Sequence, residues 1–323
     1  MYNNIRLAVQ IKKINTALHL FAVAPCNNNA WSLLVRLEPG HYPVLSDRGD
    51  RSLWAIRAAG KLLCLMRGLP KGNWLRRSWE TRTLYAIFLL MSRLLERVSR
   101  RLKRWYMFQV IASSVSRKTG LEIGGPSRDF SKEGLIPIYS RVGTLHTCNY
   151  LNANIWSNQA FDYIHEASRL ESIADATFDF LLASHILEHV ANPIKALKEW
   201  HRVLRPGGSL LVLLPNKEHT FDHRRPYTSL AHLIADFEAD TREDDLTHLE
   251  EILRLHDLEM DPPAGTPEAF RERSLKNFEN RALHHHVFDP KTVPDLFSFA
   301  GFRLTLESID FQPHIIAFGR RSA

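Results

Sequence analysis

The sequence predicts an α/β domain with a doubly wound, mostly parallel sheet over residues 116–323, closed by an antiparallel strand pair. Three observations predict it. Apolar runs of strand length alternate with segments of helical periodicity, a glycine turn follows the first of those runs, and the charge balance changes sign near residue 119. Alternating strands and helices are typical of a parallel sheet with helices on both faces.

The amino-terminal third is strongly basic. Residues 1–119 hold 21 Lys and Arg against 5 Asp and Glu, a net +16, whereas residues 120–323 hold 21 against 30, a net −9. We therefore expect a basic, mainly helical segment over 1–115, poorly ordered at its start, ahead of the domain. Lys12 and Lys13 precede an apolar run that His19 interrupts, a weak signal-peptide pattern. Three scattered cysteines indicate a reducing cytoplasm.

The end of this segment has the pattern of an amphipathic helix. Apolar residues recur every three or four positions from Leu84 to Val115, and six Arg and Lys residues crowd positions 93–104. The favoured interpretation is a helix packed on the domain with a solvated basic face. Weak peripheral contact with an anionic membrane comes second. Nucleic-acid binding comes last, because no recognition motif is present.

The domain begins with a strand that leads into a glycine turn. Leu121, Glu122 and Ile123 run directly into Gly124 and Gly125. Two glycines let the backbone turn sharply and leave no side chain to keep a ligand away. Glu122 places a carboxylate at the carboxyl end of this strand, the edge where open α/β sheets bind ligands.

The remaining elements follow in order. We expect strands, a proline-started helix and a closing strand pair, with loop over 128–143. The expected strands cover 145–150, 162–164, 178–183, 209–214, 302–309 and 314–318, and the helix covers 192–204.

Five motifs in this order resemble those of class I S-adenosylmethionine-dependent methyltransferases of the small-molecule type. They are Leu121-Glu122-Ile123-Gly124-Gly125, Glu166-Ala167, Phe178-Asp179-Phe180, the stretch 184–190 with Leu-Glu-His at its centre, and the stretch 200–208 with Arg-Val-Leu-Arg-Pro-Gly-Gly. Each motif alone is common, but the order is specific. The resemblance covers residues 116–323 and implies a Rossmann-like methyltransferase domain.

The resemblance implies a set of residues for S-adenosyl-L-methionine. Glu122 with the backbone of Gly124 and Gly125 would hold the amino-acid end of the cofactor. Asn149 stands where the family has an acid for the ribose diol, which removes charge assistance from that contact.

Two later stretches complete the implied cofactor cleft. Glu166 and Ala167 would reach the adenine, although an exposed turn explains them equally well. Ser184 and His185 would line the cleft between cofactor and acceptor.

The acceptor half is expected after the last parallel strand. Asp222, His223 and Arg224 put a carboxylate, an imidazole and a fixed cation within three residues. A neutral histidine can remove the proton of a hydroxyl acceptor, so we assign catalysis to His223, Asp222 and His185. A salt-bridged loop is the alternative. By resemblance the acceptor is a small molecule or a glycan, methylated on a hydroxyl oxygen.

Histidines and acids also gather further along the chain. His232, His248 and His256 lie within an acidic stretch, which we interpret as a solvated helical insertion over about 228–262 that acts as a lid. Adjacent residues of an extended run cannot all face one ion, so the run 284–286 is not taken as a metal site. No metal is predicted.

Two other functions compete. A dinucleotide-dependent oxidoreductase would need Gly-x-Gly-x-x-Gly, and the third glycine is missing after Gly124 and Gly125. A non-catalytic module that docks on a partner or a membrane through its basic segment keeps some support, because Pro126 and Asn149 depart from the family pattern. The residues indicate no particular oligomeric state.

Overall fold

The computed structural model describes residues 79–151, 160–311 and 313–322. The expectations for residues 1–78 lie outside this part of the chain. The described residues form one compact unit with a seven-stranded sheet at its centre. No helix among them is long and apolar enough to cross a bilayer.

The sheet has the order β3-β2-β1-β4-β5-β7-β6. Its parallel part comprises β1 (Thr119–Ile123), β2 (Thr144–Asn149), β3 (Tyr163–Ile164), β4 (Phe178–Ser184) and β5 (Leu204–Pro215). The closing antiparallel pair is β6 (Phe302–Phe311) and β7 (His314–Arg321), and β7 pairs antiparallel with β5. The predicted fold class is therefore confirmed, including the antiparallel pair.

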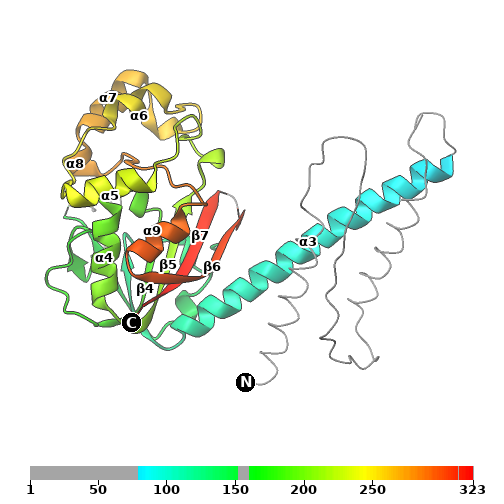
Figure 1. Ribbon diagram of the computed structural model, residues 1–323, viewed down its shortest axis with the longest axis horizontal. Coiled ribbons are helices and arrows are strands. Elements are labelled where there is room, and N and C mark those ends of the chain that lie inside the picture. Colours follow the sequence, from blue (N-terminus) through cyan, green and yellow to red (C-terminus); the bar gives the residue numbers. More distant parts are fainter. Residues whose placement is uncertain (1–78, 152–159, 312, 323) are drawn as a thin grey trace. The chain divides into compact units, whose positions relative to one another are not determined.

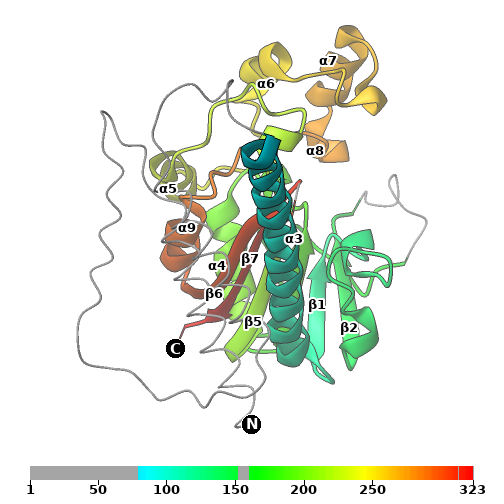
Figure 2. The same ribbon diagram turned by 90° about the vertical axis from the view of Figure 1, so that its right-hand side faces the viewer.

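Helices cover the sheet on two sides (Figure 2). On one side lie α4 (Pro193–Val203) and α9 (Val293–Phe299), whose Leu197, Trp200 and Phe297 share a core with β1 and β4. The start of α4 is fixed by Asn192, whose side chain accepts a hydrogen bond from the Lys195 N–H at 3.0 Å. A proline in the first turn costs no hydrogen bond.

The other side of the sheet packs against the end of α3 (Trp79–Val115). Met107, Ile111 and Val115 are buried there beside strand residues that alternate with those of the first face. This packing is the favoured sequence interpretation, but in the described residues it holds only for the last turns. Earlier in the helix an apolar stripe is exposed by 45–65%, namely Leu90, Leu94, Val98 and Leu102.

The remaining helices gather beyond one end of the sheet (Figure 1). They are α5 (Leu230–Glu238), α6 (Leu249–Leu255), α7 (Pro267–Leu275) and α8 (Asn277–Asn280). A small separate core holds α6 and α7 together, with Ile252 and Phe270 buried in it. The predicted acidic insertion contains α5 and α6, but it is not a solvated face throughout, since Asp257 is buried in an ion pair and the paired Asp236 and Asp261 are only 14–15% exposed.

Candidate active site

The ends of the parallel strands bring most of the predicted cofactor residues to one edge of the sheet. In the strand register, Ile123 of β1 lies beside Cys148 of β2 and Ala183 of β4. Asn149 in turn lies beside Ile164 of β3. Each predicted residue directly ends or follows one of these strands, so they share this edge because carboxyl ends of parallel strands coincide.

Glu122 is fully buried and organises the turn that follows it. Its Oε1 accepts hydrogen bonds from the Ser127 N–H at 2.8 Å and from the Tyr139 hydroxyl at 3.0 Å. Burial raises the pKa of its carboxyl to about 7, although both hydrogen bonds oppose that shift. Its contact with the amino group of a ligand stays a prediction. What the structure adds is a role in ordering the loop.

The two glycines of the turn have separate physical reasons. Gly124 has φ = +75°, a conformation that side chains disfavour, and a Cβ there would lie 1.9 Å from Cδ1 of Ile186. Gly125 lies directly against Glu122, whose Cδ would be 2.1 Å from an added Cβ. The turn therefore requires a bare backbone at both positions.

The end of β4 faces the loop after the glycine turn. Ser184 Oγ donates a hydrogen bond to Asp129 Oδ2 at 2.7 Å. His185 has φ = +53°, which is rare for a residue with a side chain and is often found at functional sites. Its Nε2 lies 2.8 Å from Nδ1 of His314 at the start of β7. Asp129 and His314 were not predicted from the sequence.

The ends of β2 and β3 hold three predicted residues in local contacts. Asn149 Oδ1 accepts a hydrogen bond from the Tyr150 N–H at 3.1 Å. The Glu166 carboxylate pairs with Arg281 at 2.6 Å. The carbonyl of Ala167 accepts a hydrogen bond from the Trp200 indole at 2.9 Å. Their roles toward ribose and adenine stay predictions.

Asp222 lies in a buried cluster and does not act together with His223. It is 2% exposed, it contacts Nδ1 of His284, and the Arg225 guanidinium lies 3.2 Å from it. Burial alone would raise the pKa of Asp222, but the charges of His284 and Arg225 outweigh it and hold that pKa below its usual value. The carboxylate is therefore ionised at neutral pH.

His223 points elsewhere, which separates the triplet Asp222-His223-Arg224. His223 Nε2 lies 2.8 Å from Asp257 Oδ2, and Arg224 reaches the same oxygen at 2.8 Å. Both side chains are partly exposed. The alternative of a salt-bridged loop thus describes His223 and Arg224, and the base role assigned to His223 stays a prediction without a neighbouring cofactor residue.

The Leu-Glu-His turn after β4 connects the two halves of the site. Glu188 is fully buried, with Oε1 3.2 Å from Nδ1 of His185. Burial alone would lower the pKa of His185 and raise that of Glu188, but their hydrogen bond and opposite charges outweigh it. The pKa of His185 is therefore raised and that of Glu188 is lowered. The next residue, His189, has its ring centroid 4.6 Å from that of His284. Burial lowers the pKa of His189 to about 4, so its imidazole is neutral.

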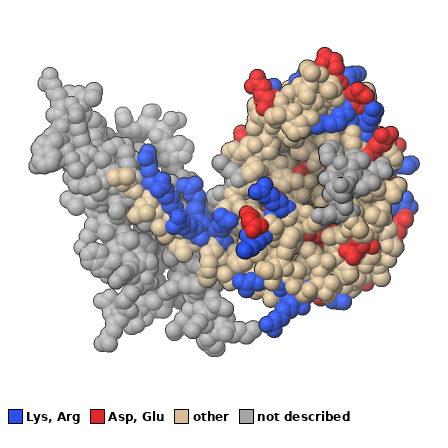
Figure 3. Space-filling model, turned by 180° about the vertical axis from the view of Figure 1, so that it is seen from behind, with Lys and Arg blue, Asp and Glu red and all other residues tan. Residues whose placement is uncertain are grey.

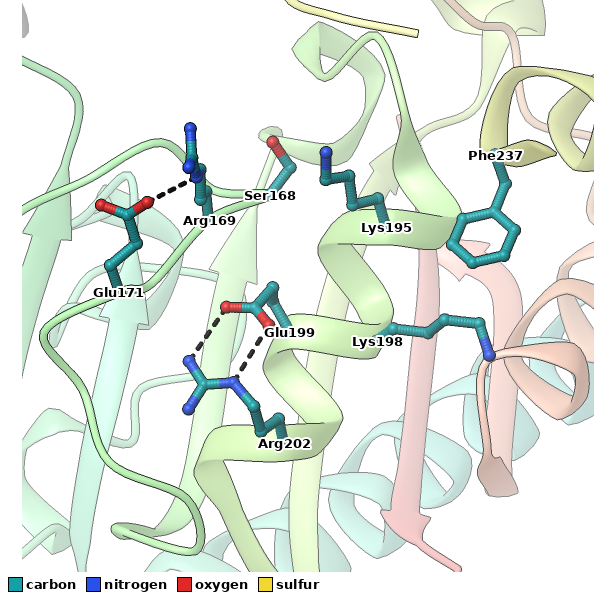
Figure 4. A pocket seen from close by; sticks show the side chains of 8 residues that line it. All are labelled: Ser168, Arg169, Glu171, Lys195, Lys198, Glu199, Arg202 and Phe237. Atoms are coloured by element: carbon teal, nitrogen blue, oxygen red, sulfur yellow. Dashed lines mark hydrogen bonds and ion pairs between the residues drawn. The ribbon is translucent and has the colours of Figure 1, made fainter. Parts of the chain in front are cut away.

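A separate cavity of about 430 Å³ lies along the outer face of α4 (Figure 4). Its charged residues are largely paired with one another or with neighbours. Arg169 lies 2.5 Å from Glu171, Arg202 lies 2.9 Å from Glu199, and Lys195 pairs with Asp240. None of the predicted site residues lines this cavity, and we do not assign it to the reaction.

Several residues that shape the site could hardly be predicted from the sequence. His284 stood in a visible histidine run, but 62 positions separate it from Asp222. Asp129, Tyr139 and His314 belong to no motif, and only the fold brings them to the strand ends. The one sequence signal for Asp129 was its position in the loop after the glycine turn, because residues of such a loop often face the ligand.

This edge suits a ligand with a cationic amino-acid end and a sugar. The turn at Gly124 lies at this edge and packs against Ile186. Asp129 and Glu122 are carboxylates beside that turn, and Asn149 offers an amide at the next strand end. The cluster of Asp222, His284 and Glu188 supplies carboxylate–imidazole pairs, an arrangement that can move a proton.

Comparisons with known proteins agree with this arrangement. Residues 143–212 match a family model described as a methyltransferase domain. The ubiquinone/menaquinone biosynthesis C-methyltransferase UbiE of Hydrogenovibrio crunogenus is 35% identical over 103 residues, which cover 29% of this chain and 39% of that protein. The sterol 4-C-methyltransferase strm-1 of Caenorhabditis elegans is 38% identical over 61 residues, 18% of each chain.

The chain thus spans less than half the length of these curated relatives. Among solved structures, an S-adenosylmethionine-dependent methyltransferase from Mesorhizobium loti aligns with 68% of this chain and 97% of its own, at 11% identity and a TM-score of 0.38. The matched segment 143–212 runs from β2 into β5 and includes the Leu-Glu-His turn. With the sheet order and the motif order, this match agrees with the resemblance to class I S-adenosylmethionine-dependent methyltransferases.

Proposed function

We propose that the protein transfers a methyl group from S-adenosylmethionine to a small-molecule or glycan acceptor, at a hydroxyl oxygen. The observation that carries this proposal is the bare turn at Gly124, which lies at the same sheet edge as Ser184 and His185. When bound, S-adenosylmethionine supplies an electrophilic methyl group on a sulfonium. Asp129, Glu122 and Asn149 are the residues that would hold it.

The chain's own chemistry would lie in the buried pair of Asp222 and His284. When Nδ1–H of His284 is donated to the ionised Asp222, the other ring nitrogen, Nε2, is the basic one. Arg225 holds Asp222 in place through its contact at 3.2 Å. This arrangement would let His284 take a proton from the acceptor while Asp222 stabilises the imidazolium.

His185 has a different place in this proposal. It pairs with Glu188, and the charge of that carboxylate favours the protonated imidazole, so His185 would position groups between the two halves. Because methyl transfer is an in-line displacement, alignment of the acceptor contributes much of the rate. Water exclusion would come from the helices α5 to α8 beyond the strand ends.

Carbon is the second candidate for the methylated atom. The curated relatives UbiE and strm-1 are both named for C-methylation. A carbon acceptor would also have to lose a proton to a base, so the same pair serves either reaction.

The test is methyl transfer from ¹³C-methyl-labelled S-adenosylmethionine into a fractionated small-molecule and glycan extract. The ¹³C chemical shift of the product separates O-methyl from C-methyl. An O-methyl product is expected. A C-methyl product would support the second candidate, and binding of S-adenosylhomocysteine with no transfer into any fraction would support the non-catalytic module.

A further inference from the structure

Four side chains converge beside the insertion, outside the cofactor edge. They are His232, Asp236, His248 and His286, and their potential ligand atoms all lie within 4.8 Å of one another. His232 and Asp236 are four residues apart on α5 and so share one face of that helix. His248 precedes the first turn of α6, and His286 lies between α8 and α9.

We propose that these four side chains form a zinc site that fastens the insertion to the domain. Three imidazoles and one carboxylate form a donor set that Zn²⁺ takes in proteins, with tetrahedral geometry. This proposal is independent of methyl transfer.

The distances between donor atoms fit a tetrahedral ion. For bonds of about 2.0–2.1 Å to nitrogen or oxygen, the donors of a tetrahedral zinc lie about 3.3 Å apart. His232 Nε2 lies 3.0 Å from His248 Nε2 and 3.2 Å from Asp236 Oδ2.

One buried atom in the cluster points independently to a missing partner. His286 Nδ1 is buried and has no hydrogen-bond partner among the described residues, whereas Asp236 Oδ2 lies 3.2 Å from His232 Nε2 and 3.7 Å from His286 Nε2. His286 is 1% exposed, and its Nε2 lies 3.1 Å from the carbonyl oxygen of Ala191. Donation of Nε2–H to that carbonyl leaves the lone pair on Nδ1, and ligating histidines commonly have such a backbone partner.

The cluster also has an entry path and a structural consequence. A surface cavity of about 330 Å³ is lined by His232 and His248, together with Tyr227 and Ser229. On the inner side, Asn192 donates a hydrogen bond to the carbonyl of Asp236 at 2.9 Å. An ion here would join α5, the start of α6 and the segment of His286 to the loop that precedes α4.

The site differs from the other two groups of possible ligands. Asp129, His185 and His314 form one, and Glu188, His189 and His284 form the other. Both lie at the strand ends and belong to the candidate active site. Substitution of His284 therefore serves as a control for ion binding at the wrong cluster.

The experiment uses the full chain with its affinity tag removed, stripped with EDTA and titrated with Zn²⁺ alone. Atomic emission should give one zinc per chain, and Co²⁺ should give the intense visible absorption of a tetrahedral centre. At a free zinc concentration of ~100 times Kd, the melting temperature should rise by ~5–10 °C.

Two variants locate the site. His232→Gln removes a ligand whose side chain is 41% exposed, so the fold should survive the change. Asp236→Asn keeps the size of the side chain and removes its charge. Each should weaken zinc binding by more than ~100-fold, beyond the 10–100-fold typical of partners that only orient a ligand.

The matched control is His256→Gln, which alters another buried imidazole that pairs with a carboxylate at 3.1 Å, outside the cluster. It should leave the zinc affinity unchanged. The proposal is overturned if the stripped protein binds neither Zn²⁺ nor Co²⁺, or if His232→Gln and Asp236→Asn bind zinc as the wild type does. Loss of zinc in His284→Gln alone would also overturn it.

Discussion

The buried carboxyl of Glu122 makes the stability of the domain depend on pH in a way that one substitution should remove. Its pKa rises from 4.5 to about 7 on folding, because burial disfavours the charge. A carboxyl with a raised folded pKa contributes its full stability below pH 4.5 and loses it as pH rises through 7. At 1.36 kcal/mol for each unit, the loss approaches ~3 kcal/mol.

Glu122→Gln keeps an acceptor oxygen for Ser127 N–H and the Tyr139 hydroxyl but cannot ionise. Urea denaturation followed by circular dichroism at pH 5 and at pH 8 gives the free energy of unfolding of both proteins. The difference, variant minus wild type, cancels the titration of all other groups. It should grow by ~2.5 kcal/mol between these pH values. Glu133→Gln, at an exposed carboxylate, should differ from wild type by the same free energy of unfolding at both pH values.

If the stability difference between Glu122→Gln and wild type is the same at pH 5 and pH 8, the reasoning is refuted, since the carboxyl would then ionise as readily in the folded chain as in the unfolded one. The same titration with saturating S-adenosylhomocysteine tests the predicted ammonium contact. If the ligand's ammonium faces Glu122, the pH-dependent difference should shrink, because the cation favours the carboxylate. An unchanged difference would leave Glu122 with its loop-ordering role alone.

Three further predictions concern the rest of the chain. His284→Ala should lower turnover by ~10²–10⁴-fold with S-adenosylhomocysteine affinity unchanged, whereas His223→Ala should change turnover little, and the reverse order would restore His223 as the base. Arg225→Leu should lower the free energy of unfolding in urea by ~3–5 kcal/mol, because it leaves the buried charge of Asp222 without its cation. Arg224→Leu, at a half-exposed side chain, should cost under ~1 kcal/mol, and equal costs would contradict this distinction. The basic run along α3 (Figure 3) and its exposed apolar stripe should give salt-sensitive sedimentation with anionic liposomes, and equal recovery with neutral lipid would exclude that role.

The parallel strands could be predicted because a strand buried on both faces is an unbroken apolar run. Leu181 and Leu182 point to opposite faces, yet both are fully buried. The glycine turn was visible for a similar local reason, since Gly124 needs a positive φ. The strand order was not predicted, but the motifs placed Glu122 and Ser184 at the carboxyl ends of parallel strands, so the edge that holds them was predictable from the sequence.

The acceptor half was less predictable, because the direction of a loop side chain depends on distant packing. Asp222 and His223 are adjacent, but one faces His284 and the other faces Asp257. The acids of the insertion were interpreted as solvated for the same reason, because their burial depends on distant packing. Glu243 resembles a solvated acid in the sequence, yet its pKa is raised to about 7 by burial against the domain.

The length of a helix was also easier to predict than what it contacts. The apolar period from Leu84 to Val115 gave the helix, but the same period covers the packed turn at Ile111 and the exposed Leu94. Periodicity reports a face and not the partner of that face.

The most direct test of the methyltransferase assignment is a calorimetric titration with S-adenosylhomocysteine of wild type, Gly124→Ala and Gly207→Ala. Both glycines have positive φ, +75° and +73°, so alanine strains the backbone equally. Only at Gly124 would the new Cβ meet a neighbour, Ile186, at the ligand edge, because nothing lies within 4 Å at Gly207. We predict that wild type and Gly207→Ala bind the ligand and that Gly124→Ala binds it at least ~10-fold more weakly, a loss of ~1.4 kcal/mol or more. No binding by the folded wild type, or equal binding by Gly124→Ala, would contradict the account.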